Sequence, residues 1–226
     1  MSHEHFAGVR LHRACTAALV CLLALASCQA PGHLSDGFLR LYAKPNPSHS
    51  SFYQCHGFGC TIVSRIELSE AEWRSVRAKF QPPPADASEE RRRIAEAVAL
   101  LQRLVGARTG TSAHQWTRQD YHLRPNPSID PTQMDCIDES VNTWTYLTMV
   151  ARDGLLRDHA VEKLAFAGGL SDFSLDPPRN AAVIRAIGSG RYFAIDPTLV
   201  DAGETPPIFP LEVWLASWPP PMSAQD

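Results

Sequence analysis

Apolar and polar positions alternate over residues 61–68, which predicts a β-strand. A helix is expected to follow at once, because Ser69 and Glu72 have the spacing of a capping box. The prolines at positions 82–84 predict that this helix ends by Phe80.

Two longer segments have apolar residues at helical spacing. The first runs from Ser88 to Gly106, where glycine is expected to end the helix, and its apolar face holds Ile94, Val98, Leu101 and Val105. The second begins at Asp135 and ends at Gly154, and its apolar residues are Ile137, Val141, Trp144, Leu147 and Val150. Between them, residues 109–131 are polar and without a sustained period, which predicts a long surface loop.

The C-terminal third predicts strands and one short helix. Two apolar runs, 181–187 and 191–195, flank Gly188-Ser189-Gly190 and predict a β-hairpin. Trp214 lies in a short predicted helix and shares a face with Trp218, so both are expected to pack on the domain. The whole pattern indicates the α+β class, with helices packed on a small antiparallel sheet.

The N-terminal segment has the features of a secretory signal. Arg10 and Arg13 precede an apolar run over residues 14–26, which is too short to span a membrane. Leu25-Ala26-Ser27 then stands directly before Cys28. This sequence resembles a lipobox, in which the cysteine takes a diacylglycerol and becomes the first residue of the mature protein. The alternative is an ordinary cleaved signal in which Cys28 has no role.

The residue after this cysteine, Gln29, bears on the final location. The absence of an aspartate there resembles lipoproteins sorted to the outer membrane, so we expect a lipid anchor on its periplasmic face. The expected organisation is a signal peptide at 1–27, a tether at 28–37, a single domain at 38–218 and a proline-rich tail at 219–226.

Composition narrows the classes of partner. The formal net charge is −3, which provides no basic field for a nucleic acid, so we expect none to bind. The expected contact with the membrane is through acyl chains rather than through the fold. We expect a monomer that needs no cofactor.

Three cysteines follow Cys28, so at least one of them has no intramolecular partner for a disulfide. In an oxidising compartment Cys55 and Cys60 are expected to close a small glycine-rich loop as a disulfide. The alternative is a metal site that combines them with His56 and His49, although the spacing matches no common zinc pattern. Cys136 is left as a free thiol.

Cys136 falls on the first turn of the predicted third helix, for which Asp135 is the N-cap. The positive end of the helix dipole stabilises a thiolate there, which suits a nucleophile. Three neighbouring carboxylates, on Asp135, Asp138 and Glu139, oppose this by repelling the anion. The alternatives are a small buried cysteine and, for the three acids, a calcium site.

A helix-start cysteine, then a hairpin, then Asp196-Pro197-Thr198 resembles the transglutaminase-like cysteine superfamily. The resemblance covers roughly residues 88–198 and implies a papain-like core. It also implies that Cys136 is the nucleophile and Asp196 the acid that orients a histidine.

The histidine of that family has no counterpart in the hairpin. Arg179 and Asn180 stand in its place, and neither accepts a proton from a thiol near neutral pH. We expect these two residues to take part in binding. His159 is the only histidine between the cysteine and the aspartate, and it is our first candidate for a substitute base, with His114 and His122 as further candidates.

These observations favour a lipid-anchored envelope protein whose transglutaminase-like domain has lost catalysis and serves as a binding or assembly module. Its expected ligand is a peptide or a fragment derived from peptidoglycan. The alternative is an active periplasmic amide hydrolase or acyl transferase that uses Cys136. The weakest alternative is the calcium site.

Overall fold

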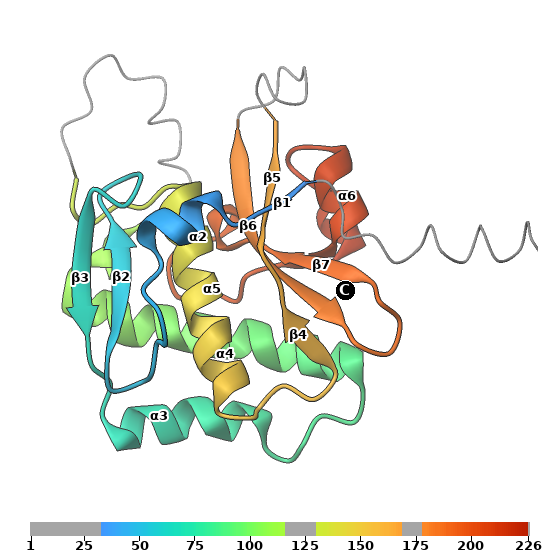
Figure 1. The fold of residues 1–226 in the computed structure, drawn as a ribbon, viewed down its shortest axis with the longest axis horizontal. Helices are drawn as coiled ribbons and strands as arrows, with labels where there is room; N and C mark the ends of the chain where they lie inside the picture. The colour runs from blue at the N-terminus through green and yellow to red at the C-terminus, as the bar shows by residue number, and fades with distance from the viewer. Residues whose placement is uncertain (1–32, 116–129, 169–177, 226) are drawn as a thin grey trace, which may run out of the picture. The chain divides into compact units, whose positions relative to one another are not determined.

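The largest sheet of the protein is antiparallel and is built around one long strand, β6 (Arg179–Ala186) (Figure 1). The computed structural model describes residues 33–115, 130–168 and 178–225. The strand order is β1-β5-β6-β7-β8, and β4 pairs with the same edge of β6 as β5 does. The other strands are β1 (Leu34–Ser35), β4 (His159–Val161), β5 (Leu164–Ala167), β7 (Tyr192–Ile195) and β8 (Ile208–Pro210). The predicted hairpin is confirmed as β6 and β7, and so is the α+β class.

Alternation along β6 divides its side chains between two apolar clusters. Ala182 and Ile184 belong to the larger cluster, which also holds apolar residues of α5 (Cys136–Arg152). Ala181 and Val183 belong to a smaller cluster with residues of α6 (Leu211–Ala216). The sheet therefore has α5 on one face and α6 on the other.

The second predicted helix, α4 (Ala87–Thr109), is longer than expected at both ends. Asp86 caps its start by accepting the N–H of Glu89, and Gly110 ends it with a left-handed backbone at φ 80°. Gly106, which we expected to end it, lies inside the helix. A Cβ there would come within 2.7 Å of Ser112. Glycine at this position therefore lets the chain after α4 pack close to the helix.

The predicted first helix is confirmed as α3 (Glu70–Arg77), and the capping box of Ser69 and Glu72 is formed. A 3-10 turn continues it to Phe80. The predicted strand is confirmed as β3 (Ile62–Ile66). It pairs with β2 (Phe52–His56), which the sequence pattern does not predict, because four of its five residues are buried and no alternation remains.

Part of the expected tether forms regular structure. Leu34 and Ser35 form β1 against β5, and α2 (Gly37–Tyr42) follows, so part of the expected tether at 28–37 belongs to the fold. The signal segment and Cys28 lie outside the described residues. Among the residues that are described, no helix is both long enough and apolar enough to span a membrane.

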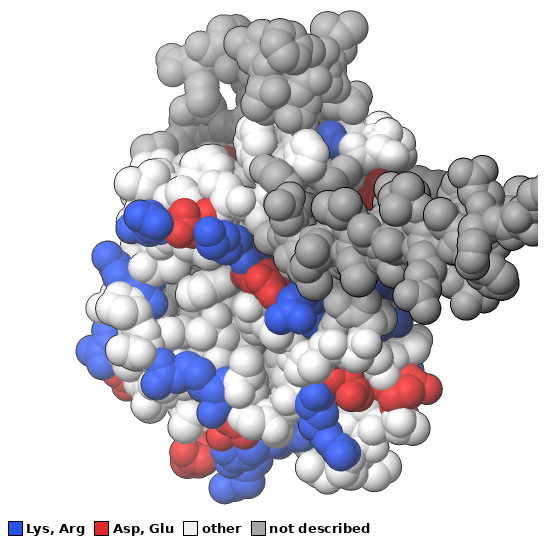
Figure 2. Space-filling view, turned by 45° about the vertical axis from the view of Figure 1, so that its right-hand side comes forward, with Lys and Arg blue, Asp and Glu red and all other residues white. Residues whose placement is uncertain are grey.

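Charges of both signs are interspersed on the face drawn in Figure 2. Exposed charges also pair along α4, where Arg92 contacts Glu89 at 3.1 Å and Glu96 at 3.1 Å. Pairs of this exposed kind contribute little to stability.

Candidate functional site

The helix that carries Cys136 starts as the sequence predicts. Asp135 is its N-cap and accepts the backbone N–H groups of Ile137 and Asp138, each at 3.0 Å. The Asp138 carboxylate accepts the N–H of Asp135 in return, at 3.1 Å. This reciprocal pair satisfies donors that would otherwise be unpaired at the helix start. It fixes Cys136 as the first residue of α5.

The predicted disulfide between Cys55 and Cys60 is present, and the loop it closes lies against the start of α5. Within that loop Phe58 and Cys60 donate their N–H groups to Asp138 at 2.9 and 2.7 Å. The two sulfurs and one Asp138 oxygen lie within 4.8 Å of one another. Because the sulfurs are bonded to each other, they are not metal ligands in this state, and the metal interpretation of this loop is not supported.

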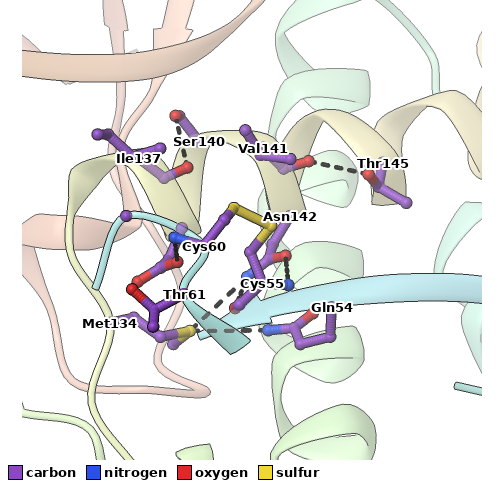
Figure 3. The surroundings of a disulfide bond; sticks show 12 residues. Gln54, Cys55, Cys60, Thr61, Met134, Ile137, Ser140, Val141, Asn142 and Thr145 are labelled. Carbon is purple, nitrogen blue, oxygen red and sulfur yellow. Dashed lines mark hydrogen bonds between the residues drawn. A yellow bond between two sulfur atoms is a disulfide. The ribbon is translucent and has the colours of Figure 1, made fainter. Parts of the chain in front are cut away.

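Figure 3 shows that α5 also holds the strand before the disulfide. The side-chain amide of Asn142 donates to the carbonyl of Cys55 at 2.8 Å and accepts its N–H at 2.7 Å, as a neighbouring strand would. Asn142 and Gln54 both donate to the sulfur of Met134. Nothing in the sequence pattern reveals the pairing of Asn142 with Cys55, because these residues are 87 positions apart.

The Cys136 thiol faces the sheet rather than the disulfide loop. Its sulfur accepts the side-chain N–H of Asn180 at 3.6 Å and lies 3.8 Å from the carbonyl oxygen of Pro178. Burial and then the charge of Asp135 raise the pKa of this thiol to about 12. The thiol is therefore protonated at neutral pH, chiefly because of its burial.

Strand alternation decides which of the two residues in the hairpin faces the thiol. Asn180 does, on the same face of β6 as Ala182. Arg179 lies on the opposite face, with its guanidinium 5.0 Å from the ring centre of Trp214 and 5.1 Å from that of Trp218. It also donates to the carbonyl oxygen of Trp214 at 3.1 Å. Only Asn180 is placed to touch a group bound at the thiol.

Asp196 follows β7 and lies at the same end of the sheet as Asn180, because Ile195 pairs with Ala182. One of its carboxylate oxygens accepts the indole N–H of Trp214 at 2.7 Å. The other accepts the N–H and the hydroxyl of Thr198 at 3.1 and 2.5 Å. Burial raises the pKa of Asp196 despite these bonds. The acid is thus engaged by tryptophan and threonine, a role for Trp214 that the sequence does not reveal.

His159 is not at the site, and its proposed role as substitute base is wrong. It begins β4, where it pairs with Ala186 at the far end of β6, and six residues of extended strand, about 20 Å, separate that position from Asn180. Its ring is buried and contacts Glu90 at 2.9 Å and Arg91 at 3.2 Å. It is a core residue that joins β4 to α4.

His114 is buried too, although we expected it in a surface loop. It accepts the N–H of Met134 on Nδ1 at 3.2 Å, and its Nε2 lies 3.5 Å from Glu139. Burial lowers the pKa of His114, so the ring is neutral at neutral pH. His122 lies outside the described residues.

The three acids of the first turn do not converge on one point as a calcium site requires. Asp135 and Asp138 point to the disulfide loop, whereas Glu139 faces His114, and neither of its oxygens has a hydrogen-bond partner among the described residues. Burial and then the charge of Asp196 raise the pKa of Glu139 well above its ordinary value. A protonated acid is a poor cation ligand, so this alternative is not supported.

No protein-family model, curated protein or solved structure matches the chain. Of the expected site residues that the structure describes, only Asn180 contacts the Cys136 sulfur. Asp196 lies at the same end of the sheet but is hydrogen-bonded to Trp214, on which Arg179 packs. His159 lies at the other end of β6. The described groups around the thiol can donate and accept hydrogen bonds, but none of them is a base for the thiol proton.

Proposed function

We propose that the chain is a lipid-anchored protein on the periplasmic face of the bacterial outer membrane, and that its transglutaminase-like domain binds its ligand without cleaving it. The ligand is a peptide or a peptidoglycan-derived fragment. The papain-like core, the anchor on Cys28 and the ligand class are parts of this proposal.

One observation carries the non-catalytic role. The group that faces the Cys136 sulfur is the amide of Asn180, at 3.6 Å. An amide donates a hydrogen bond but does not take up a proton, so the thiol cannot be activated through it. The thiol pKa of about 12 agrees, because the thiolate fraction at neutral pH is then negligible.

The same groups suit recognition of an amide-containing ligand. Asn180 offers both a donor and an acceptor beside the Cys136 thiol. Trp214 and Thr198 hold Asp196 in place, so the end of the sheet is rigidly built around these groups. A preorganised polar end of this kind supports binding with little loss of side-chain freedom.

The test uses the full lipidated protein in detergent, incubated with purified muropeptides. We expect saturable binding, no cleaved product, and the same binding in Cys136→Ser. The wild-type thiol should also react with iodoacetamide more slowly than a free cysteine.

A second variant, Asn180→Leu, removes the polar group while keeping a similar volume. Loss of muropeptide binding in this variant, at an unchanged melting temperature, supports the proposed site. Hydrolysis of a muropeptide amide that disappears in Cys136→Ser would instead overturn the proposal and establish the active hydrolase.

A further inference from the structure

We propose that the loop closed by the Cys55–Cys60 disulfide is a clamp on the first turn of α5, and that formation of this disulfide sets the reactivity of the Cys136 thiol. The clamp is defined as residues 57–60. It acts on Cys136 whether this thiol reacts or only binds, so the inference does not depend on the proposed function.

The backbone of the clamp has an uncommon conformation. Its four residues, Gly57, Phe58, Gly59 and Cys60, all have positive φ, at 77°, 67°, 62° and 55°. Two of them carry side chains, for which this region is unfavourable. A run of this kind turns successive N–H groups toward one side, where they receive an anion. The disulfide ties Cys60, the last residue of the run, to Cys55 of β2 and opposes relaxation of the run.

The anions that the clamp receives are the two capping carboxylates of α5. Phe58 and Cys60 donate to the two oxygens of Asp138, and Gly59 donates to Asp135 at 2.9 Å. Asp138 is fully buried and Asp135 is 7% exposed. Buried carboxylates need such donors, because water cannot replace them. Without the clamp, the first turn cannot keep both acids in place.

Cys136 lies between these two acids in the chain, while its sulfur faces Asn180 on the other side. Cys136 is half-buried, and burial is the largest cause of the raised pKa of its thiol. If the clamp is released, the first turn opens, more of the sulfur is exposed to water and its pKa falls toward the ordinary value. The oxidised clamp therefore keeps the thiol unreactive.

The disulfide forms by exchange with an oxidising protein disulfide. The thiolate of Cys55 or Cys60 attacks that disulfide, and the other of these two cysteines then displaces the oxidant's sulfur. Two electrons pass to the oxidant, which leaves as a dithiol with the two protons. In the reduced chain the site around Cys136 is incomplete.

The experiment compares the rate of iodoacetamide labelling at Cys136 in the full lipidated protein and in Cys55→Ser/Cys60→Ser, followed by peptide mass spectrometry. We expect the rate in the double variant to rise by at least about tenfold at pH 8. Val76→Ala is the matched control, because it destabilises a fully buried position of α3 without touching the clamp. Its rate should equal that of the wild type.

A second variant, Asp138→Asn, keeps the disulfide but replaces one of the two oxygens that accept the N–H groups of the clamp. It tests the proposal even if the double variant does not fold. Its labelling rate should rise in the same direction. Wild-type rates in folded Asp138→Asn, or an equal rise in Val76→Ala, would overturn the proposal.

Discussion

The side-chain amide of Asn180 donates to the sulfur of Cys136 at 3.6 Å, across the space between β6 and the first turn of α5. This contact places an asparagine where an activated thiol needs a base. The neighbouring Arg179 is on the opposite face of the strand, against Trp214. Creating a catalytic pair would therefore require a change at position 180 alone.

Asn180→His should create that pair. An imidazole beside the sulfur takes up its proton near neutral pH and stabilises the thiolate, so the rate of iodoacetamide labelling at Cys136 should rise at least about tenfold at pH 7. Arg179→His is the matched control, because its ring lies on the wrong face, and it should leave the rate unchanged. A wild-type rate in folded Asn180→His would mean that position 180 does not govern the thiol.

His159→Ala should lower stability without changing the thiol. The substitution removes one of the partners of the buried Glu90 and the contact with Arg91, which should cost about 2–4 kcal/mol of unfolding free energy. Chemical denaturation measures this loss. The labelling rate of Cys136 should stay within about twofold of the wild type, since the two residues lie about 20 Å apart along β6. A large fall in that rate would restore His159 as a base.

Trp214→Phe should lower stability, because Asp196 accepts a hydrogen bond from the indole N–H. The indole N–H is the partner of one Asp196 oxygen, and its loss leaves a buried acceptor unpaired, at a cost of about 1–3 kcal/mol. Thermal unfolding should show the loss, and Trp218→Phe, at a half-buried position, should show a smaller one. Equal losses in the two variants would argue against this hydrogen bond.

Glu139→Gln should raise stability at alkaline pH. The pKa of Glu139 is raised in the folded chain, so the unfolded chain loses this proton first, and stability falls as pH rises from about 4.5 through the raised value. An amide has no proton to lose. The variant should gain about 1–3 kcal/mol at pH 8 and nothing at pH 4.

The pH series also identifies the state of the neighbouring histidine. His114 lies 3.5 Å from Glu139, and the other charges close to Glu139 are the carboxylates of Asp135, Asp138 and Asp196. A loss of stability in Glu139→Gln at pH 8 would show an ionised glutamate paired with a charged histidine, contrary to the lowered pKa of His114.

Cys28→Ala tests the anchor that the N-terminal sequence predicts. The variant should move from the outer-membrane fraction to the soluble periplasmic fraction and lose incorporation of labelled palmitate. Wild-type fractionation of this variant would leave an ordinary cleaved signal as the interpretation of residues 1–27.

Local sequence determined the starts of α3 and α5. The capping boxes at Ser69 and Asp135 depend on residues three positions apart, so the spacing alone predicts them. The disulfide follows in the same way from two nearby cysteines in a glycine-rich loop. The end of α4 was misplaced, because Gly106 serves a tertiary approach to Ser112 rather than a helix end.

Tertiary structure decided which of the chemically active residues meet. The sequence left Arg179 and Asn180 equivalent, and only the side of β6 that faces α5 selects the asparagine. It also favoured His159 for its position between Cys136 and Asp196, whereas the pairing of β4 with the far end of β6 removes it from the site. Short-range spacing fixes backbone hydrogen bonds within an element, but strand register and helix packing depend on contacts between residues far apart in the chain.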